Sequence, residues 1–130
     1  MTHLTSRSKC GTGWRIHRPG WDVTGGEQKT GLSTLPLFHT NGQTVQMNTN
    51  LYGGNRVVLL PRFDAKTTLD TMIAEKVNFW IGVPAMFWSL LKYADDNDYD
   101  VSHIADNMKV CTSGGAPMPV EVMLEFQEKF

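Results

Sequence analysis

The fold class follows from one stretch of sequence, VNFWIGVPAMFWSLLKYA at residues 77–94. The part before the proline is rich in β-branched and aromatic side chains, a composition typical of a buried strand. Pro84 suits the first turn of a helix, because its missing amide hydrogen would have no partner there. Apolar residues then share one helical face, at Phe87, Leu90, Leu91 and Ala94. The stretch therefore predicts a buried strand that leads directly into an amphipathic helix.

Strand and helix patterns alternate on both sides of this stretch. Strands are predicted at residues 32–38, 56–60 and 108–112. Helices are predicted at residues 41–52, after the capping residue Asp64, and at 119–130 with Val120, Met123 and Leu124 on one side. Residues 95–107 are interpreted as a polar connection. Because alternating strands and helices form parallel βαβ units with right-handed crossovers, we predict an α/β fold with a partial layer of about three or four parallel strands under covering helices.

Composition separates residues 1–30 from residues 31–130. The first segment carries five basic and two acidic residues, and the second carries seven basic and eleven acidic residues. No helical or strand period is visible in residues 1–30, so we expect them to be disordered and the ordered domain to begin at residue 31. A misread start or a shifted reading frame is one hypothesis for the origin of the first segment.

The overall composition excludes several classes of protein. The chain has 130 residues, a length typical of one domain. Its net charge is −1, so it does not show the excess of basic residues that is typical of a nucleic-acid-binding protein. Its two cysteines, Cys10 and Cys111, are too few for a disulfide framework. No apolar run reaches the roughly 18 residues of a transmembrane helix, and residues 1–20 contain no apolar stretch typical of a secretory signal, so we expect neither feature. We expect a cytoplasmic protein, with peripheral attachment to a membrane left open.

The first candidate site is the glycine turn Ser113-Gly114-Gly115-Ala116-Pro117. It lies where a predicted strand passes into a helix, and parallel α/β sheets bind ligands at the carboxyl ends of their strands. The glycines allow the backbone to approach a ligand closely, and the free amides of the next helix favour an anion. The turn lacks the lysine and hydroxyl residue of a Walker loop. An ordinary strand-to-helix turn is the alternative.

The second candidate is His39, which follows the apolar residues Pro36-Leu37-Phe38. A histidine in this place can line a pocket, although a lone histidine is more often simply half-buried and hydrogen-bonded. No carboxylate or cysteine has a spacing that makes it a partner, so no catalytic residue is assigned. The acidic run at residues 95–100 does not fit a calcium loop, and the histidines are scattered, so no metal site is predicted.

Three motifs in order resemble one known family. They are Leu35-Pro-Leu-Phe-His39 with the following Thr-Asn-Gly-Gln-Thr, then Gly82-Val-Pro-Ala-Met86, then Ser113-Gly-Gly-Ala-Pro-Met-Pro119. Their order and spacing resemble the middle of the large N-terminal domain of the adenylate-forming superfamily, which includes acyl-CoA synthetases, luciferases and peptide-synthetase adenylation domains. The stretch Leu59-Leu-Pro-Arg-Phe-Asp64 makes the chain most similar to a long-chain fatty-acid-CoA ligase. The resemblance covers about residues 31–130.

The resemblance implies a function. A carboxylic acid would react with ATP, in the presence of Mg²⁺, to give an acyl-adenylate, from which coenzyme A would displace AMP. His39 would lie between the acyl pocket and the thiol tunnel, and Asn41 and Gly42 would lie along the acyl pocket wall. Adenine and the acyl site would be contacted by Gly114, Gly115, Ala116 and Pro117. Asn41 takes a place where an apolar or aromatic residue is common, so the acyl preference stays open.

Other motifs of the family do not occur in this sequence. They are the phosphate loop ending in Pro-Lys-Gly, the Tyr-Gly-x-Thr-Glu motif, the ribose-binding aspartate, and the small C-terminal domain with its catalytic lysine. Since stabilisation of the transferring charge needs such groups in place beforehand, we expect these residues alone not to catalyse acyl activation. The alternatives are a non-catalytic α/β module that binds a nucleotide or a partner, and a remnant without a stable fold.

Overall fold

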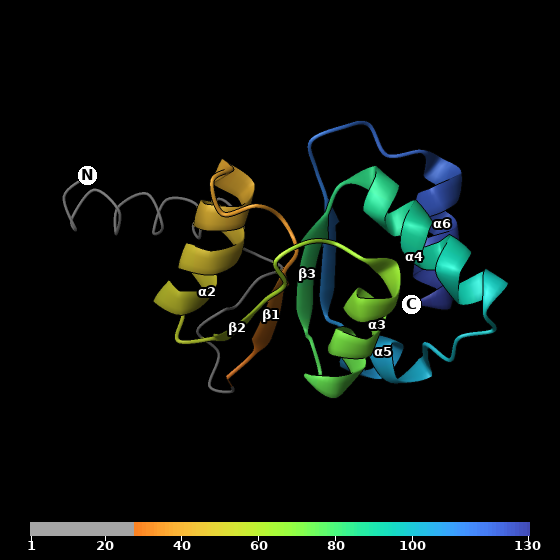
Figure 1. Ribbon diagram of the computed structural model, residues 1–130, viewed down its shortest axis with the longest axis horizontal. Helices are drawn as coiled ribbons and strands as arrows, with labels where there is room; N and C mark the ends of the chain where they lie inside the picture. Colours follow the sequence, from red (N-terminus) through yellow and green to blue (C-terminus); the bar gives the residue numbers. More distant parts are fainter. Residues whose placement is uncertain (1–27) are drawn as a thin grey trace.

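The computed structural model describes residues 28–130, which are built on a four-stranded parallel sheet (Figure 1). Its strands are β1 (Thr30–Ser33), β2 (Arg56–Leu59), β3 (Phe79–Gly82) and β4 (Val110–Ser113), in the order β2-β1-β3-β4. Each neighbouring pair is parallel. The α/β prediction is therefore confirmed, and all four carboxyl ends lie at one edge of the sheet. The expectation of disorder at residues 1–30 falls almost wholly outside the described residues.

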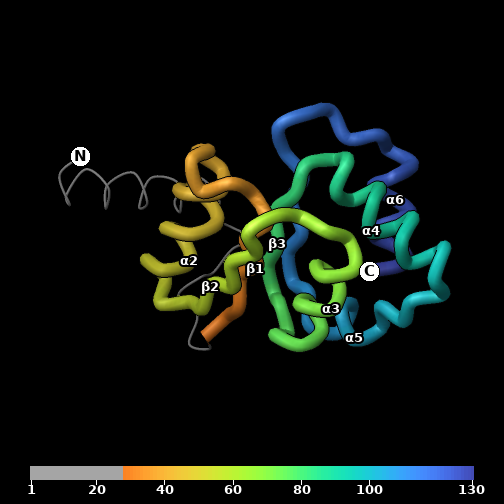
Figure 2. Tube along the Cα trace, in the orientation of Figure 1, coloured from red at the N-terminus to blue at the C-terminus, as the bar shows by residue number. Residues whose placement is uncertain are grey.

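Helices cover both faces of the sheet (Figures 1 and 2). One face carries η1 (Asn41–Asn48) and α2 (Thr49–Tyr52). The other carries α3 (Ala65–Ala74), α4 (Pro84–Asp96), α5 (Ser102–Asn107) and α6 (Val120–Lys129). The main apolar core lies on this second side and includes Leu32, Leu69, Met72, Trp80, Phe87 and Leu90. A smaller cluster around Phe79 and Ile81 faces η1.

The unit of β3 and α4 forms as its sequence predicts. All four residues of β3 are buried, Pro84 stands in the first turn of α4, and the predicted face of that helix is buried throughout. Asp64 caps α3, where its side chain accepts a hydrogen bond from the Thr67 amide. Burial of the apolar stripe and a satisfied first turn are what these residue types favour.

Two helices differ from the sequence-based expectation. Residues 95–107 are not only a connection, because α4 extends to Asp96 and α5 occupies Ser102–Asn107. Ile104 is buried in the core, and the Asp100 side chain accepts a hydrogen bond from the Ser102 amide at 2.9 Å. A single buried side chain and a local hydrogen bond just before the helix thus stabilise a helix that is too short to show a period.

The last helix turns a different side to the core than its sequence suggested. Val120, Met123 and Leu124 are 58%, 47% and 57% exposed. Phe126 is buried instead, between Phe87 at 4.7 Å and Phe130 at 4.4 Å between ring centroids. α6 carries two apolar stripes, and aromatic packing against α4 selects one of them. No helix among residues 28–130 is long and apolar enough to cross a membrane.

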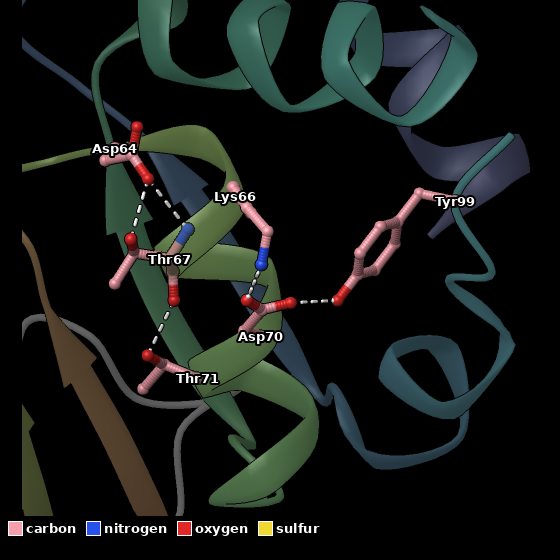
Figure 3. A network of polar contacts seen from close by, with 6 residues as sticks. All are labelled: Asp64, Lys66, Thr67, Asp70, Thr71 and Tyr99. Atoms are coloured by element: carbon pink, nitrogen blue, oxygen red, sulfur yellow. Dashed lines mark hydrogen bonds and ion pairs between the residues drawn. The ribbon is translucent and has the colours of Figure 1, made fainter. Parts of the chain in front are cut away.

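A polar network joins α3 to the segment before α5 (Figure 3). Asp70 accepts hydrogen bonds from Lys66 Nζ at 2.6 Å and from the Tyr99 hydroxyl at 2.5 Å. Desolvation, together with the bond to Asp70, raises the pKa of Tyr99 to about 12 from its ordinary 10.0. The same two hydrogen bonds lower the pKa of the Asp70 carboxyl.

We expect Tyr99 to make stability dependent on alkaline pH. A tyrosine whose folded pKa lies above its unfolded pKa contributes stability below pH 10.0, and this contribution is lost as pH rises towards about 12. Urea unfolding should therefore show a stability difference between the wild type and Tyr99→Phe that shrinks across this range. Tyr52→Phe, at an exposed tyrosine, is the control. A difference that stays constant with pH would contradict the assignment.

Candidate functional site

The candidate site lies where successive strands switch from one side of β1 to the other in the sheet. The chain leaves β1 towards β2 on one side, and later places β3 on the other side of β1. The connection after β1 therefore runs to η1 on one face, while the connection after β3 runs to α4 on the opposite face (Figure 1). In an open α/β sheet, the space between loops that diverge in this way at the carboxyl ends of the strands is where a ligand-binding crevice is expected.

Polar contacts attach η1 to the sheet beside this crevice. Ser33 Oγ donates to Gln46 Oε1 at 2.8 Å, and Gln46 Nε2 donates to the carbonyl oxygen of Ile81 at 2.7 Å. Gln46 is only 1% exposed, so it bridges the ends of β1 and β3 inside the protein. Asn50, one turn later, packs so closely on β1 that a Cβ atom at Gly31 would lie 2.8 Å from its Nδ2.

Sequence reasoning did not identify Gln46 or Asn50 as important. Their spacing of four residues places them on one side of a helix, and this is the available signal. The structure also forms η1 as a π-helix rather than the expected α-helix. π-Helical turns are rare and often occur near functional sites. Here the wider turn accompanies a helix that docks through amides and hydroxyls instead of an apolar stripe.

His39 lies in the loop before η1, and Asn41 and Gly42 are the first two residues of that helix. The His39 amide donates to the Pro36 carbonyl at 3.0 Å, which closes a turn. A Cβ atom at Gly42 would lie 2.3 Å from the same Pro36 oxygen, so only glycine fits there. The backbone amide of Asn41 donates to His39 Nδ1 at 3.3 Å.

The glycine turn after β4 is held against the end of β3. The Gly114 amide donates to the Gly82 carbonyl at 3.2 Å. Gly115 adopts a φ of +85°, a left-handed conformation that favours glycine, and a Cβ atom there would contact the Val83 side chain at 3.6 Å. The turn therefore needs its second glycine for its conformation.

The two candidate segments meet at this edge. A Cβ atom at Gly114 would lie 3.8 Å from Asn41 Nδ2, so the absence of a side chain at Gly114 leaves open space beside the side-chain amide of Asn41. The structure therefore brings Asn41 and Gly114 together, and Gly42 and Gly115 are their neighbours in the chain. His39 is exposed beside Asn41, and Ala116 and Pro117 are exposed on the same turn, with no contact to η1 recorded among the described residues.

Two other features were considered as possible sites: the hollow beside α6 and the groups that could bind a metal ion. A hollow of about 720 Å³ between β4 and α6 is lined mostly by apolar side chains, among them Met108, Cys111 and Phe126. Burial raises the pKa of the Cys111 thiol to about 12, so it is not an activated nucleophile. Residues 28–130 contain no group of three His, Cys, Asp or Glu side chains that could hold a metal ion.

Comparison with known proteins identifies the family. The family model described as AMP-binding enzyme matches residues 1–130 of this chain. The chain belongs to the AMP-binding enzyme family. The predicted membership of the adenylate-forming superfamily is thereby confirmed, and the family match includes the first thirty residues as well as the motifs described above.

Several relatives of the chain are named as CoA ligases. The chain is 36% identical over 108 residues to a long-chain-fatty-acid–CoA ligase of Bacillus subtilis, covering 83% of this chain and 18% of the relative. It is 31% identical over 98 residues to an indoleacetate–CoA ligase of Aromatoleum aromaticum, covering 75% of this chain and 18% of that protein. The chain therefore spans about a fifth of the length of these curated AMP-binding relatives.

Solved structures of the family share the fold. The match to apo MatB from Rhodopseudomonas palustris has a TM-score of 0.72 at 23% identity and covers 97% of this chain and 22% of that one. The match to the N-terminal domain of FACL13 from Mycobacterium tuberculosis has a TM-score of 0.77 at 23% identity, covering 95% and 29%. The arrangement of strands and helices is thus that of the N-terminal domain of these AMP-binding proteins.

Proposed function

We propose that this chain is part of an ATP-dependent acyl-CoA ligase. Such an enzyme joins a carboxylic acid to AMP with release of pyrophosphate, and then transfers the acyl group to the thiol of coenzyme A. The observation that carries the proposal is the meeting of Asn41 and Gly114 at the carboxyl edge of the parallel sheet. Family membership and the identity to CoA ligases support it. We propose a cytoplasmic setting, with a role in fatty-acid metabolism.

In this proposal the two sides of the crevice have different tasks. The turn formed by residues 114–117 presents backbone to the adenine ring, because glycine at position 114 leaves no side chain between the turn and η1. Asn41 and Gly42 form part of the wall beside the acyl group, and His39 lies next to them at the entrance for the thiol. Gln46 orients this wall by bonding to Ser33 and Ile81.

The described residues supply only part of such a site. The printed 130 residues do not include the phosphate loop or the catalytic lysine that the resemblance to the family implies. Charge that develops on the transferring group would therefore lack its stabilising partners. We expect the purified chain to bind adenylates without releasing pyrophosphate when a carboxylic acid and ATP are supplied. The alternative is a non-catalytic module that binds a nucleotide or a partner.

Calorimetric titration of the chain tests the proposal. We expect a non-hydrolysable acyl-adenylate analogue to bind more tightly than AMP, because both sides of the crevice then contribute contacts. Gly114→Val should weaken binding of this analogue roughly tenfold, about 1.4 kcal/mol, since its methyl groups fill the space beside Asn41. Ala105→Val, on the exposed side of α5, is the control and should bind as the wild type does.

Each outcome separates the candidates. Equal affinity for AMP and the acyl-adenylate analogue would favour a module that recognises only the nucleotide. A folded chain that binds neither would refute an adenylate site at this edge. Pyrophosphate release that depends on the acid would overturn the expectation that these residues are inactive alone.

A further inference from the structure

The sheet ends at β4 in an edge that no strand of residues 28–130 covers. β4 is the last strand in the order β2-β1-β3-β4. The Val110 amide points towards β3 and donates to the Asn78 carbonyl at 3.1 Å. Because successive residues of a strand point their amides and carbonyls to opposite sides, those of Cys111 and Ser113 face the open edge. A row of unpaired backbone groups of this kind is a template for another strand.

The side chains next to this edge are also incompletely covered. A hollow of about 720 Å³ separates β4 from α6 and is lined mostly by apolar groups. The Ser113 hydroxyl belongs to its lining and is buried without a hydrogen-bond partner among the described residues. On α6, Met123 lines the hollow and shares an exposed apolar stripe with Val120 and Leu124. The open edge and the exposed stripe of α6 therefore adjoin the same hollow.

A second β4 that runs antiparallel matches this edge. With a two-fold axis beside Thr112, Cys111 of each copy would oppose Ser113 of the other, and each opposed pair would exchange two backbone hydrogen bonds. The open groups of both edges would then be paired. Opposed residues of paired strands place their side chains on the same face, so the Cys111 thiol of one copy would lie beside the unpartnered Ser113 hydroxyl of the other.

The charges near the edge are complementary under the same symmetry. Lys109 precedes β4, and Glu121 lies in the first turn of α6, which follows the carboxyl end of β4. Both residues are exposed, and neither has an ion pair recorded within residues 28–130. Antiparallel pairing brings the amino end of one β4 to the carboxyl end of the other. Lys109 of each copy would therefore approach the Glu121 end of the other, which favours association.

We propose that β4 and α6 form a homodimerisation surface, to which a second copy of this chain adds its own β4 in the antiparallel direction. The two-fold axis is perpendicular to the joined sheet, so both α6 helices lie on one face of it. Their exposed apolar stripes cover the hollows, and water is excluded from the Ser113 hydroxyls. The inference does not depend on the proposed function, because no residue of the dimer surface is required to contact a ligand.

Sedimentation of the full chain, with variants at Thr112, tests the proposal. Thr112 is exposed in the single chain but faces its own copy across the two-fold axis of the dimer. We expect the wild type to sediment as a dimer. Thr112→Lys sets two positive charges opposite one another and should raise the dissociation constant roughly fivefold or more. Thr112→Val keeps a β-branched side chain and should dimerise as the wild type does. Ala105→Lys adds the same charge on the exposed side of α5 and is the control for charge.

A cross-link tests the register of the two strands. Antiparallel positions without hydrogen bonds bring Cα atoms to about 4.5 Å, within reach of a disulfide. Thr112→Cys should therefore form a link between positions 112 of two copies under copper-catalysed air oxidation, located by peptide mass mapping. Ala105→Cys should form no link at position 105.

The outcomes decide the occupant of the edge. A wild type that stays monomeric at its highest soluble concentration would overturn the proposal and leave the edge to solvent or to a strand of a different polypeptide. A dimer that forms equally well with Thr112→Lys, or that shows no link at position 112, would also overturn it. Circular dichroism in urea separates loss of the dimer from loss of the fold, and the cross-link tests the surface even if lysine disturbs β4.

Discussion

Replacing Trp80 with alanine is expected to lower the free energy of unfolding by about 3–5 kcal/mol. Trp80 is fully buried in β3, and its ring lies 4.7 Å from that of Phe87 and 6.5 Å from that of Phe126. Its indole Nε1 donates to Thr34 Oγ1 at 3.1 Å. The ring also covers Gly82, where a Cβ atom would lie 2.6 Å from Cη2. Alanine would therefore leave a large cavity in the core and remove the indole donor from the Thr34 hydroxyl, which would keep only its contact with Met86 Sδ at 3.9 Å.

Urea unfolding followed by circular dichroism measures this loss. Trp88→Ala is the matched control, because Trp88 lies in α4 but is 56% exposed, and its loss should change stability by much less. Trp80→Phe should fall between the wild type and Trp80→Ala, since it keeps much of the ring volume and loses the bond to Thr34. Equal effects at positions 80 and 88 would show that the core is not centred on β3.

Replacing Gln46 with leucine should cost about 2–4 kcal/mol, although leucine is similar in size. The change leaves Ser33 Oγ and the Ile81 carbonyl oxygen buried without the partners they now have at 2.8 and 2.7 Å. An unpaired buried polar group costs about 1–3 kcal/mol, and here two would be created. The same variant should weaken binding of an acyl-adenylate analogue, because η1 would no longer be held against the ends of β1 and β3.

Gln43→Leu is the control for this variant. Gln43 belongs to the same helix but is exposed, so the change removes no bond between η1 and the sheet. Circular dichroism in urea gives the stability, and calorimetry with the acyl-adenylate analogue gives the binding. A leucine at position 46 that stabilised the chain would mean that η1 docks by apolar contact, which contradicts the observed network.

Local sequence patterns predicted much of the architecture. The run of β-branched and aromatic residues before Pro84 formed β3, and the apolar positions of α4 were all buried. Asp64 capped α3. These elements were predictable because a strand or a helix with one strongly apolar face has only one favourable orientation on a core.

The sequence patterns of three helices were too weak to predict how these helices pack. α5 is short and buries one residue, Ile104, so its sequence shows no period. α6 has two apolar stripes, and the one that includes Val120 and Leu124 is exposed. η1 has hardly any apolar face, and the contacts of Gln46 in η1 and of Asn50 in α2 depend on partners more than ten residues away in the chain. In each of these helices, tertiary packing decides which residues are buried.

For the candidate site, the glycine turn and the residues around His39 were identified from composition and resemblance, as two separate segments. Their meeting was decided by the parallel sheet, which brings the ends of β1, β3 and β4 to one edge and leaves Asn41 beside Gly114. The sequence by itself determined the α/β class, the buried unit of β3 and α4, and the family. Only the tertiary structure decided which face of α6 is buried, how η1 docks on the sheet, and that the side-chain amide of Asn41 lies beside Gly114. The physical reason is that apolar periodicity acts within one element, whereas hydrogen bonds and close contacts between elements depend on positions that local sequence does not encode.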